Sequence, residues 1–228
     1  MHIAEGFLPP AHAVAWTVAA APFVVHGAHQ VIKLSKEKPE SRLLLAAAGA
    51  FTFVLSAIKL PSVTGSSSHA TGTGIGAILF RPPVMAFLAT IVLIFQAVLL
   101  AHGGLTTLGA NVFAMGIVGP WAAYAAFRGL RSLRVGDTPA IFVAVAVANI
   151  ATYATTSVQL ALAFPDPASG FLGAFAKFAG LFAVTQVPLA ITEGILAVLL
   201  FRALARIATR ELNVLGFGRP SAKESSHV

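Results

Sequence analysis

VMAFLATIVLIFQAVLL, residues 84–100, is an apolar run that contains no charged side chain. A membrane-spanning helix needs about 20 mostly apolar residues, and this run approaches that length. The whole chain has a similar character, since 57% of its 228 residues are hydrophobic and 10% are charged. Soluble domains carry about 25% charged residues. The sequence therefore predicts an all-α integral membrane protein.

Similar apolar stretches precede and follow this run. We expect seven transmembrane helices, at about 11–32, 42–60, 71–80, 84–100, 108–127, 140–162 and 175–208. The last is longer than a membrane requires, so one end should emerge into water. The third is short, begins with several glycines and is stopped by Arg81-Pro82-Pro83. We expect it to start in a protein-lined cavity, where irregular backbone at membrane depth is tolerated.

The basic residues predict the direction of the crossings. If all seven stretches cross and the N-terminus lies outside, every Lys and Arg except Lys59 and Lys177 falls on the cytoplasmic side. This matches the bias of basic residues towards the cytoplasm, so the net charge of +7 does not call for a nucleic-acid partner. We expect an external N-terminal metal-binding segment (1–10), a seven-helix transmembrane domain (11–212) and a disordered cytoplasmic tail (213–228). The predicted location is the bacterial plasma (inner) membrane, in contact with lipid.

This topology gathers three polar segments at the external face. They are the N-terminus, residues 61–74 and residues 101–111, which are rich in Gly, Ser, Thr, His and Asn. Polar groups collected at one end of an apolar bundle indicate a binding site. The absence of cysteine excludes thiolate ligands and cysteine nucleophiles from it.

The opening residues, MHIAEGFLPP, offer an unusual set of nitrogen ligands. They contain no Lys or Arg, so we do not expect a secretory signal. The α-amine of Met1, the amide nitrogen of His2 and the near nitrogen of its imidazole can close fused five- and six-membered chelate rings around one metal. The amide binds only when a strongly polarising ion removes its proton. Planar nitrogen coordination favours Cu(II) or Ni(II), or Co(II) where the protein imposes the geometry.

A second imidazole would fill the fourth position of this plane. His69, within GSSSHATG at residues 65–72, lies on the same predicted face. The neighbouring hydroxyl groups could fix its tautomer through the second ring nitrogen; they belong to Ser67, Ser68 and Thr71. The alternative is that both histidines are ordinary surface residues.

Three further polar residues can each be interpreted in two ways. His102 and Asn111 either orient the ligating imidazoles or satisfy helix ends. Glu193 is an ionisable group inside the last apolar stretch, where carboxylates are costly and usually functional. Because it closely follows Pro188, it could instead stabilise a broken helix or a subunit contact.

Four motifs carry a family resemblance. They are MHIAEGFLP at 1–9, GSSSHATGTGIG at 65–76, AHGGLTTLGANVF at 101–113 and Thr192-Glu193-Gly194. With them, nearly the whole chain except its C-terminal tail resembles the CbiM/NikM family, the substrate-capture (S) components of energy-coupling-factor transporters for cobalt and nickel.

The resemblance implies a fold, a ligand set and partners. The fold is an S-component bundle with an added N-terminal helix. The metal is held by the amine of Met1, the amide and imidazole of His2, and the imidazole of His69. The partners are a transmembrane coupling subunit, cytoplasmic ATPase subunits and a small membrane subunit. The cobalt and nickel branches of the family use the same ligands. The sequence of the 65–76 loop is more similar to the cobalt branch and favours Co(II), with Ni(II) as the alternative.

We therefore expect a binding and transport subunit and not an enzyme. The chain has no GxxxxGK[ST] motif for ATP, so any driving energy must come from another subunit. A self-sufficient channel or carrier is a competing hypothesis, but it should show two matched repeats with interrupted helices. An intramembrane metal hydrolase would need an acid and an open coordination position, and Glu5 is the only nearby acid.

Overall fold

Helices form at each of the stretches that hydropathy selects. The structure, a computed structural model, describes residues 2–58, 60–61, 66–215 and 217. The helices are α1 (Pro10–Glu37), α2 (Ser41–Ala57), α3 (Thr73–Phe80), α4 (Pro82–Leu100), α5 (Leu108–Asn111), a π-helix η1 (Val112–Val118), α6 (Gly119–Ser132), α7 (Asp137–Ala163), α8 (Gly170–Ile207) and α9 (Thr209–Val214). The expectation of an all-helical membrane protein is confirmed, apart from a small sheet described below.

The described residues contain five helical segments long and apolar enough to cross a membrane. They are α1, α4, the continuous stretch Leu108–Ser132, α7 and α8. Helix α2, with 17 residues, and α3, with 8, are shorter. The seven crossings and the outward N-terminus therefore stay predictions.

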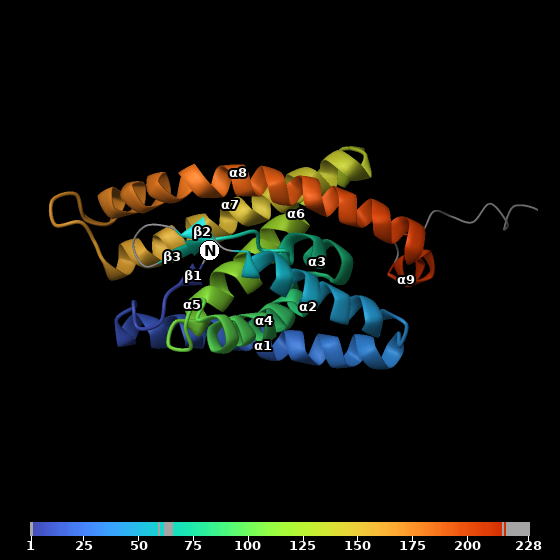
Figure 1. Ribbon diagram of the computed structural model, residues 1–228, viewed down its shortest axis with the longest axis horizontal. Helices are drawn as coiled ribbons and strands as arrows, with labels where there is room; N and C mark the ends of the chain where they lie inside the picture. Colours follow the sequence, from blue (N-terminus) through green and yellow to red (C-terminus); the bar gives the residue numbers. More distant parts are fainter. Residues whose placement is uncertain (1, 59, 62–65, 216, 218–228) are drawn as a thin grey trace, which may run out of the picture.

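The helices form two sides with a short helix between them. Figure 1 shows α7 beside α8 on one side and α1 beside α4 on the other, and both pairs are in contact. Helix α3 lies between the two sides and touches α4, α6 and α7. All eight of its residues are buried, which fits a helix that never faces lipid. Its backbone is surrounded by protein at every turn.

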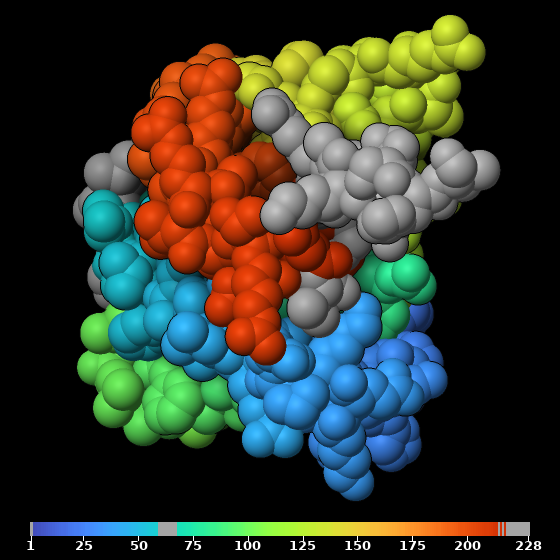
Figure 2. Space-filling view, turned by 90° about the vertical axis from the view of Figure 1, so that its right-hand side faces the viewer, coloured from blue at the N-terminus to red at the C-terminus, as the bar shows by residue number. Residues whose placement is uncertain are grey.

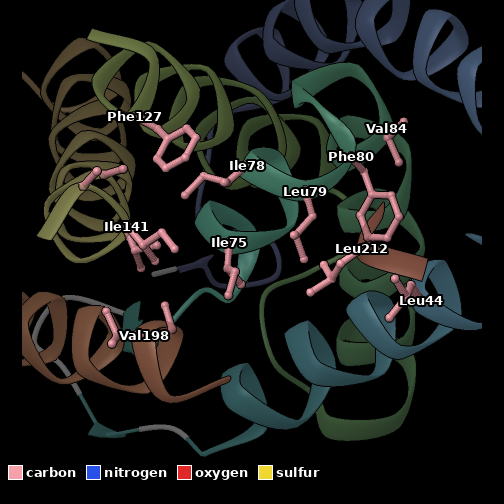
Figure 3. Close-up of a cluster of buried hydrophobic side chains, with 14 of the residues drawn as sticks. Leu44, Ile75, Ile78, Leu79, Phe80, Val84, Phe127, Ile141, Val198 and Leu212 are labelled. Carbon is pink, nitrogen blue, oxygen red and sulfur yellow. The ribbon is translucent and has the colours of Figure 1, made fainter. Parts of the chain in front are cut away.

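The side chains of α3 build the centre of the core. In Figure 3, Ile75, Ile78, Leu79 and Phe80 lie among side chains from the surrounding helices, which include Leu44, Phe127, Ile141, Val198 and Leu212. Burying large apolar side chains contributes about 1.5–3 kcal/mol each in water-soluble cores; inside a membrane the gain comes from close packing instead. This cluster fixes where the loop before α3 must emerge.

The C-terminal end of the described chain folds back on the bundle. Helix α9 contacts α2 and α8, and the red end of the chain lies beside the blue α1–α2 region in Figure 2. Phe217 packs its ring on Phe127 and Phe201. Residues 216 and 218–228, most of the expected tail, lie outside the described part of the chain.

A three-stranded sheet is the feature that hydropathy did not indicate. Strand β3 (Ser66–Ser68) pairs antiparallel with β1 (His2–Ile3) on one side and β2 (Leu60–Pro61) on the other. The register sets His2 opposite Ser67. Strand β3 consists of serines alone, which are not among the residues enriched in strands, so it depends on its pairing with β1 and β2.

Glycines bring α1 close to its neighbours. A Cβ atom on Gly27 would lie 2.2 Å from the carbonyl oxygen of Pro83, at the start of α4. A Cβ on Gly109 would lie 2.3 Å from Cα of Thr17 in α1. Small residues at such contacts let membrane helices approach closely. Helix α1 is thus tied to both α4 and α5.

We predict that Gly27→Ala destabilises the bundle by about 1–3 kcal/mol, because α1 must move away from Pro83 to admit the methyl group. Thermal melting of the purified protein in detergent measures the effect. Gly49→Ala is the matched control, since nothing lies within 4 Å of a Cβ atom there. Equal melting temperatures for the two variants would contradict this account of α1 packing.

Candidate metal centre

Three histidines from distant parts of the sequence meet inside the bundle. The ring centroids of His2 and His69 are 4.3 Å apart, and His102 lies 4.7 Å from each. Each residue is at most 1% exposed. One ring nitrogen from each can be chosen so that all three lie within 4.8 Å of one another. The sequence predicted the two outer-face histidines together, and the structure adds His102 to the same cluster.

A buried hydrogen-bond relay fixes the tautomer of His2. The carbonyl of Thr52 can only accept, so the single hydroxyl proton of Ser56 is donated to it. Ser56 Oγ then accepts from Gln96 Nε2, which turns Gln96 Oε1 towards His2. That oxygen accepts from His2 Nε2 at 2.7 Å. Nε2 therefore carries the proton, and the lone pair remains on Nδ1.

His69 has the opposite tautomer. Its Nδ1 donates to the carbonyl of Ala70 at 2.8 Å, because a carbonyl cannot donate. Nε2 is left with the lone pair, and among the described residues no group hydrogen-bonds this buried atom. The two histidines thus present Nδ1 and Nε2, and Nδ1 is the near nitrogen that the six-membered chelate ring of His2 requires.

The strand that carries His2 is held from both sides. Asn111 accepts from the Ile3 amide at 2.8 Å and donates to the Ile3 carbonyl at 3.0 Å. Thr107 also donates to that carbonyl, at 2.8 Å. The Asn111 side chain therefore acts as a substitute strand opposite β3. Its contact is with the backbone next to His2 and not with an imidazole.

The loop that carries His69 is held by Glu193. This buried carboxylate in α8 accepts from the Thr71 amide, the Thr71 hydroxyl and the Gly72 amide at 2.7–2.9 Å. It also accepts from Asn149 Nδ2 at 2.7 Å. Four donors can stabilise a buried carboxylate without a cation. Glu193 thus connects the metal-side loop to α7 and α8, within an unbroken α8.

The hydroxyl groups near His69 have other partners than its ring. Ser68 Oγ hydrogen-bonds Thr185 of α8 at 2.7 Å, and the Thr71 hydroxyl is used by Glu193. The expectation that Ser68 and Thr71 fix the tautomer is wrong, because the Ala70 carbonyl accepts from His69 Nδ1, while the same expectation for Ser67 stays a prediction. Met1 and the side chain of Ser67 lie outside the described part of the structure.

Glu5 is turned towards the 101–111 loop. Its exposed carboxylate accepts from the Thr106 amide at 3.2 Å. Hydrogen bonds from Thr106 lower the pKa of Glu5 below its ordinary value of 4.5. The group is therefore a carboxylate at neutral pH, engaged by the loop. This position does not favour the hydrolase hypothesis, which needs an acid beside the metal.

The surroundings of His69 favour its neutral form. Burial lowers the pKa of His69 well below its ordinary value of 6.5, and the nearby His2 and His102 rings lower it further. Among the described residues, the cluster that could hold a metal contains histidines alone. Neutral imidazoles suit late first-row metals, whereas Mg(II) and Ca(II) prefer oxygen ligands.

The relay residues Gln96 and Ser56 are absent from the sequence-based prediction. Gln96 is the one amide side chain in the apolar run 84–100, and it is fully buried. A polar group in such a run usually faces the bundle interior and has a function. That signal could have identified Gln96, although not its partner.

Comparisons with known sequences connect the chain to one family of transport proteins. Residues 2–211 match the family CbiM, described as the cobalt uptake substrate-specific transmembrane region. The chain is 66% identical to the cobalt transport protein CbiM of Streptomyces coelicolor, over 95% of this chain and 93% of that protein. It is 62% identical to that of Propionibacterium freudenreichii, over 95% and 92%.

Solved structures show the same architecture. A crystal structure of a transition metal transporter superposes with a TM-score of 0.79 and 25% identity, covering 95% of this chain and 97% of the other. A truncated transition metal transporter gives a TM-score of 0.77, also at 25% identity, over 90% and 98%.

We predict that Gln96→Ala weakens cobalt binding by roughly 10- to 100-fold, because His2 loses the acceptor that orients it. Gln96→Glu keeps an acceptor and should bind better than Gln96→Ala. Titration of the purified protein with Co(II) measures both. Gln159→Ala is the control, since Gln159 is equally buried but donates to the Ala110 carbonyl. Equal loss in Gln96→Ala and Gln159→Ala would contradict the relay.

We also predict that the metal-free protein loses stability as the pH falls below about 6.5. The unfolded chain takes up a proton on His69 there, while the folded chain, with its lowered pKa, does not. The free energy of unfolding then falls by up to about 1.4 kcal/mol per pH unit until the folded pKa is reached. Melting at pH 7.5 and 5.5 tests this, and His69→Asn should show a smaller pH effect. The same pH effect in both proteins would contradict it.

Proposed function

The chain belongs to the CbiM family of cobalt uptake substrate-specific transmembrane regions, and from this premise we propose that it is the substrate-capture subunit of an ATP-driven cobalt(II) importer. As a member of this family it is a transport component and not a catalyst. Cobalt is the substrate for which its curated relatives are named. The described part of the chain has the membrane-spanning helices that such a role requires.

One observation carries the proposed binding mode: the buried rings of His2 and His69 lie 4.3 Å apart, and hydrogen bonds engage Nε2 of His2 and Nδ1 of His69, which leaves His2 Nδ1 and His69 Nε2 as the proposed ligand atoms. We propose that these nitrogens, the His2 amide and the α-amine of Met1 bind Co(II) together. Asn111 and Glu193 hold the two segments that carry the ligands. Ser68 and Thr71 hold the His69 segment to α8 through Thr185 and Glu193, His102 lies beside both rings, and a role for Ser67 stays a prediction.

A planar set with a deprotonated amide would ordinarily favour Cu(II) or Ni(II). Support for cobalt comes from the relatives, which are named cobalt transport proteins. Nickel remains the alternative substrate within the same ligand set. Competition between Co(II) and Ni(II) on the purified protein decides between them.

The proposed energy source and partners lie outside this chain. We propose that cytoplasmic ATPase subunits, a transmembrane coupling subunit and a small membrane subunit complete the importer, since the chain contains no GxxxxGK[ST] motif of its own. We propose that the ligand-bearing segment, residues 1–10, faces outward and that the C-terminus is cytoplasmic, in the bacterial inner membrane. Cobalt uptake that persists without the ATPase subunits would instead indicate a self-sufficient channel or carrier.

We predict that His69→Ala abolishes cobalt capture, with a loss greater than the roughly 10- to 100-fold that removal of an outer partner costs. His29→Ala is the control, because His29 is exposed on α1. Adding one residue before Met1 should be as damaging as His69→Ala, since it moves the amine away from the His2 chelate. The same residue added after Val228 should leave binding unchanged. Equilibrium titration with Co(II) measures all four proteins, and unchanged affinity in the extended protein would exclude the amine as a ligand.

A further inference from the structure

His102 lies beside both of the proposed imidazole ligands and not behind one of them. Its ring is as close to His2 as to His69, at 4.7 Å from each, and it is 1% exposed. One of its nitrogens belongs to the group of three that lie within 4.8 Å of one another. A residue that merely oriented one imidazole would need to approach that ring alone. Equal proximity to both rings places His102 beside both of the proposed imidazole ligands.

The backbone around His102 is held in an unfavourable conformation. Ala101 adopts a left-handed conformation, with φ 46° and ψ 43°, and Gly103 follows with φ 75°. A residue with a Cβ atom rarely adopts this conformation, and such outliers concentrate at functional sites. The amides of Ala101 and His102 both donate to the Gln96 carbonyl. The helix end that supplies the relay to His2 therefore also aims His102.

The segment is packed directly on the first strand. A Cβ atom on Gly103 would lie 3.4 Å from Cβ of His2 and 3.2 Å from Nδ2 of Asn111. Glycine thus allows the chain after His102 to pass close to His2. Packing on this side and the relay on the other leave the cluster little freedom to rearrange.

We propose that His102 supplies a fifth, axial nitrogen to the metal and that this ligand favours Co(II) over Ni(II). The inference rests on the proposed function, in which the amine, the amide and two imidazoles occupy the plane. A further nitrogen can then bind only above or below that plane. Planar Ni(II) in a strong nitrogen field has a filled axial orbital, which repels a fifth ligand. Co(II) has one electron fewer and accepts it. Nitrogen donors alone do not select cobalt, so the axial position is where selection can arise.

The test compares both metals on the full chain with its native start. We expect His102→Ala to lower the affinity for Co(II) by roughly tenfold more than the affinity for Ni(II). The electron paramagnetic resonance spectrum of the Co(II) form should change in this variant, and added imidazole should restore it. Labelling with ¹⁵N-histidine should alter the axial nitrogen splitting in the wild-type protein only. His102→Gln, which keeps a polar group of similar reach, serves if the alanine variant does not fold.

The outcomes separate this inference from the proposed function. Equal loss of affinity for both metals, or an unchanged cobalt spectrum in His102→Ala, would overturn the axial role while leaving the planar site in place. Retention of cobalt by His69→Ala would overturn the planar site itself. His29→Ala should match the wild-type protein in every measurement, because its side chain lies on the exposed surface of α1.

Discussion

A two-residue strand buried inside a helical membrane protein must have its backbone groups paired, because no water or lipid can satisfy them there. Strand β3 pairs with one edge of β1. Asn111 and Thr107 satisfy the amide and carbonyl of Ile3 on the other edge. This pairing is what allows His2 to be buried at all. The position of β3, and hence of His69, follows from the same requirement.

Burial also determines which nitrogen each histidine offers. In an apolar bundle an imidazole N–H must find an acceptor, and the acceptors are the Gln96 side chain for His2 and the Ala70 carbonyl for His69. Since each ring has one proton, satisfying one nitrogen leaves the other with a lone pair. The tautomers are thus consequences of packing, with Thr52 and Ser56 setting the direction of the relay to His2. A ligand set prepared in this way requires little ordering when a metal arrives.

The helices could be predicted from sequence because a membrane helix satisfies its own backbone and is selected by hydropathy alone. The run 84–100 became Pro82–Leu100, within two residues of expectation. The proximity of His2 and His69 followed from gathering polar segments at one face. The sheet could not be predicted, since its strands are two or three residues long and β1 is distant in sequence from β2 and β3. The position of His102 beside the other two histidines could not be predicted either, because it depends on the left-handed backbone conformation of Ala101.

The site is also joined to the longest helix of the bundle. Glu193 receives four hydrogen bonds, three of them from Thr71 and Gly72, and Ser68 bonds Thr185. A glutamine at this position would direct its NH2 group at some of these N–H and O–H donors. Only a carboxylate, with two accepting oxygens, can satisfy all four. The loop that carries His69 is therefore fixed to α8 on one side, while β1 is fixed to α5 on the other. Helix packing between these elements, and not the loops themselves, sets the distance between the two imidazoles. A rigid separation of this kind is the means by which a protein imposes a coordination geometry that the metal alone would not choose.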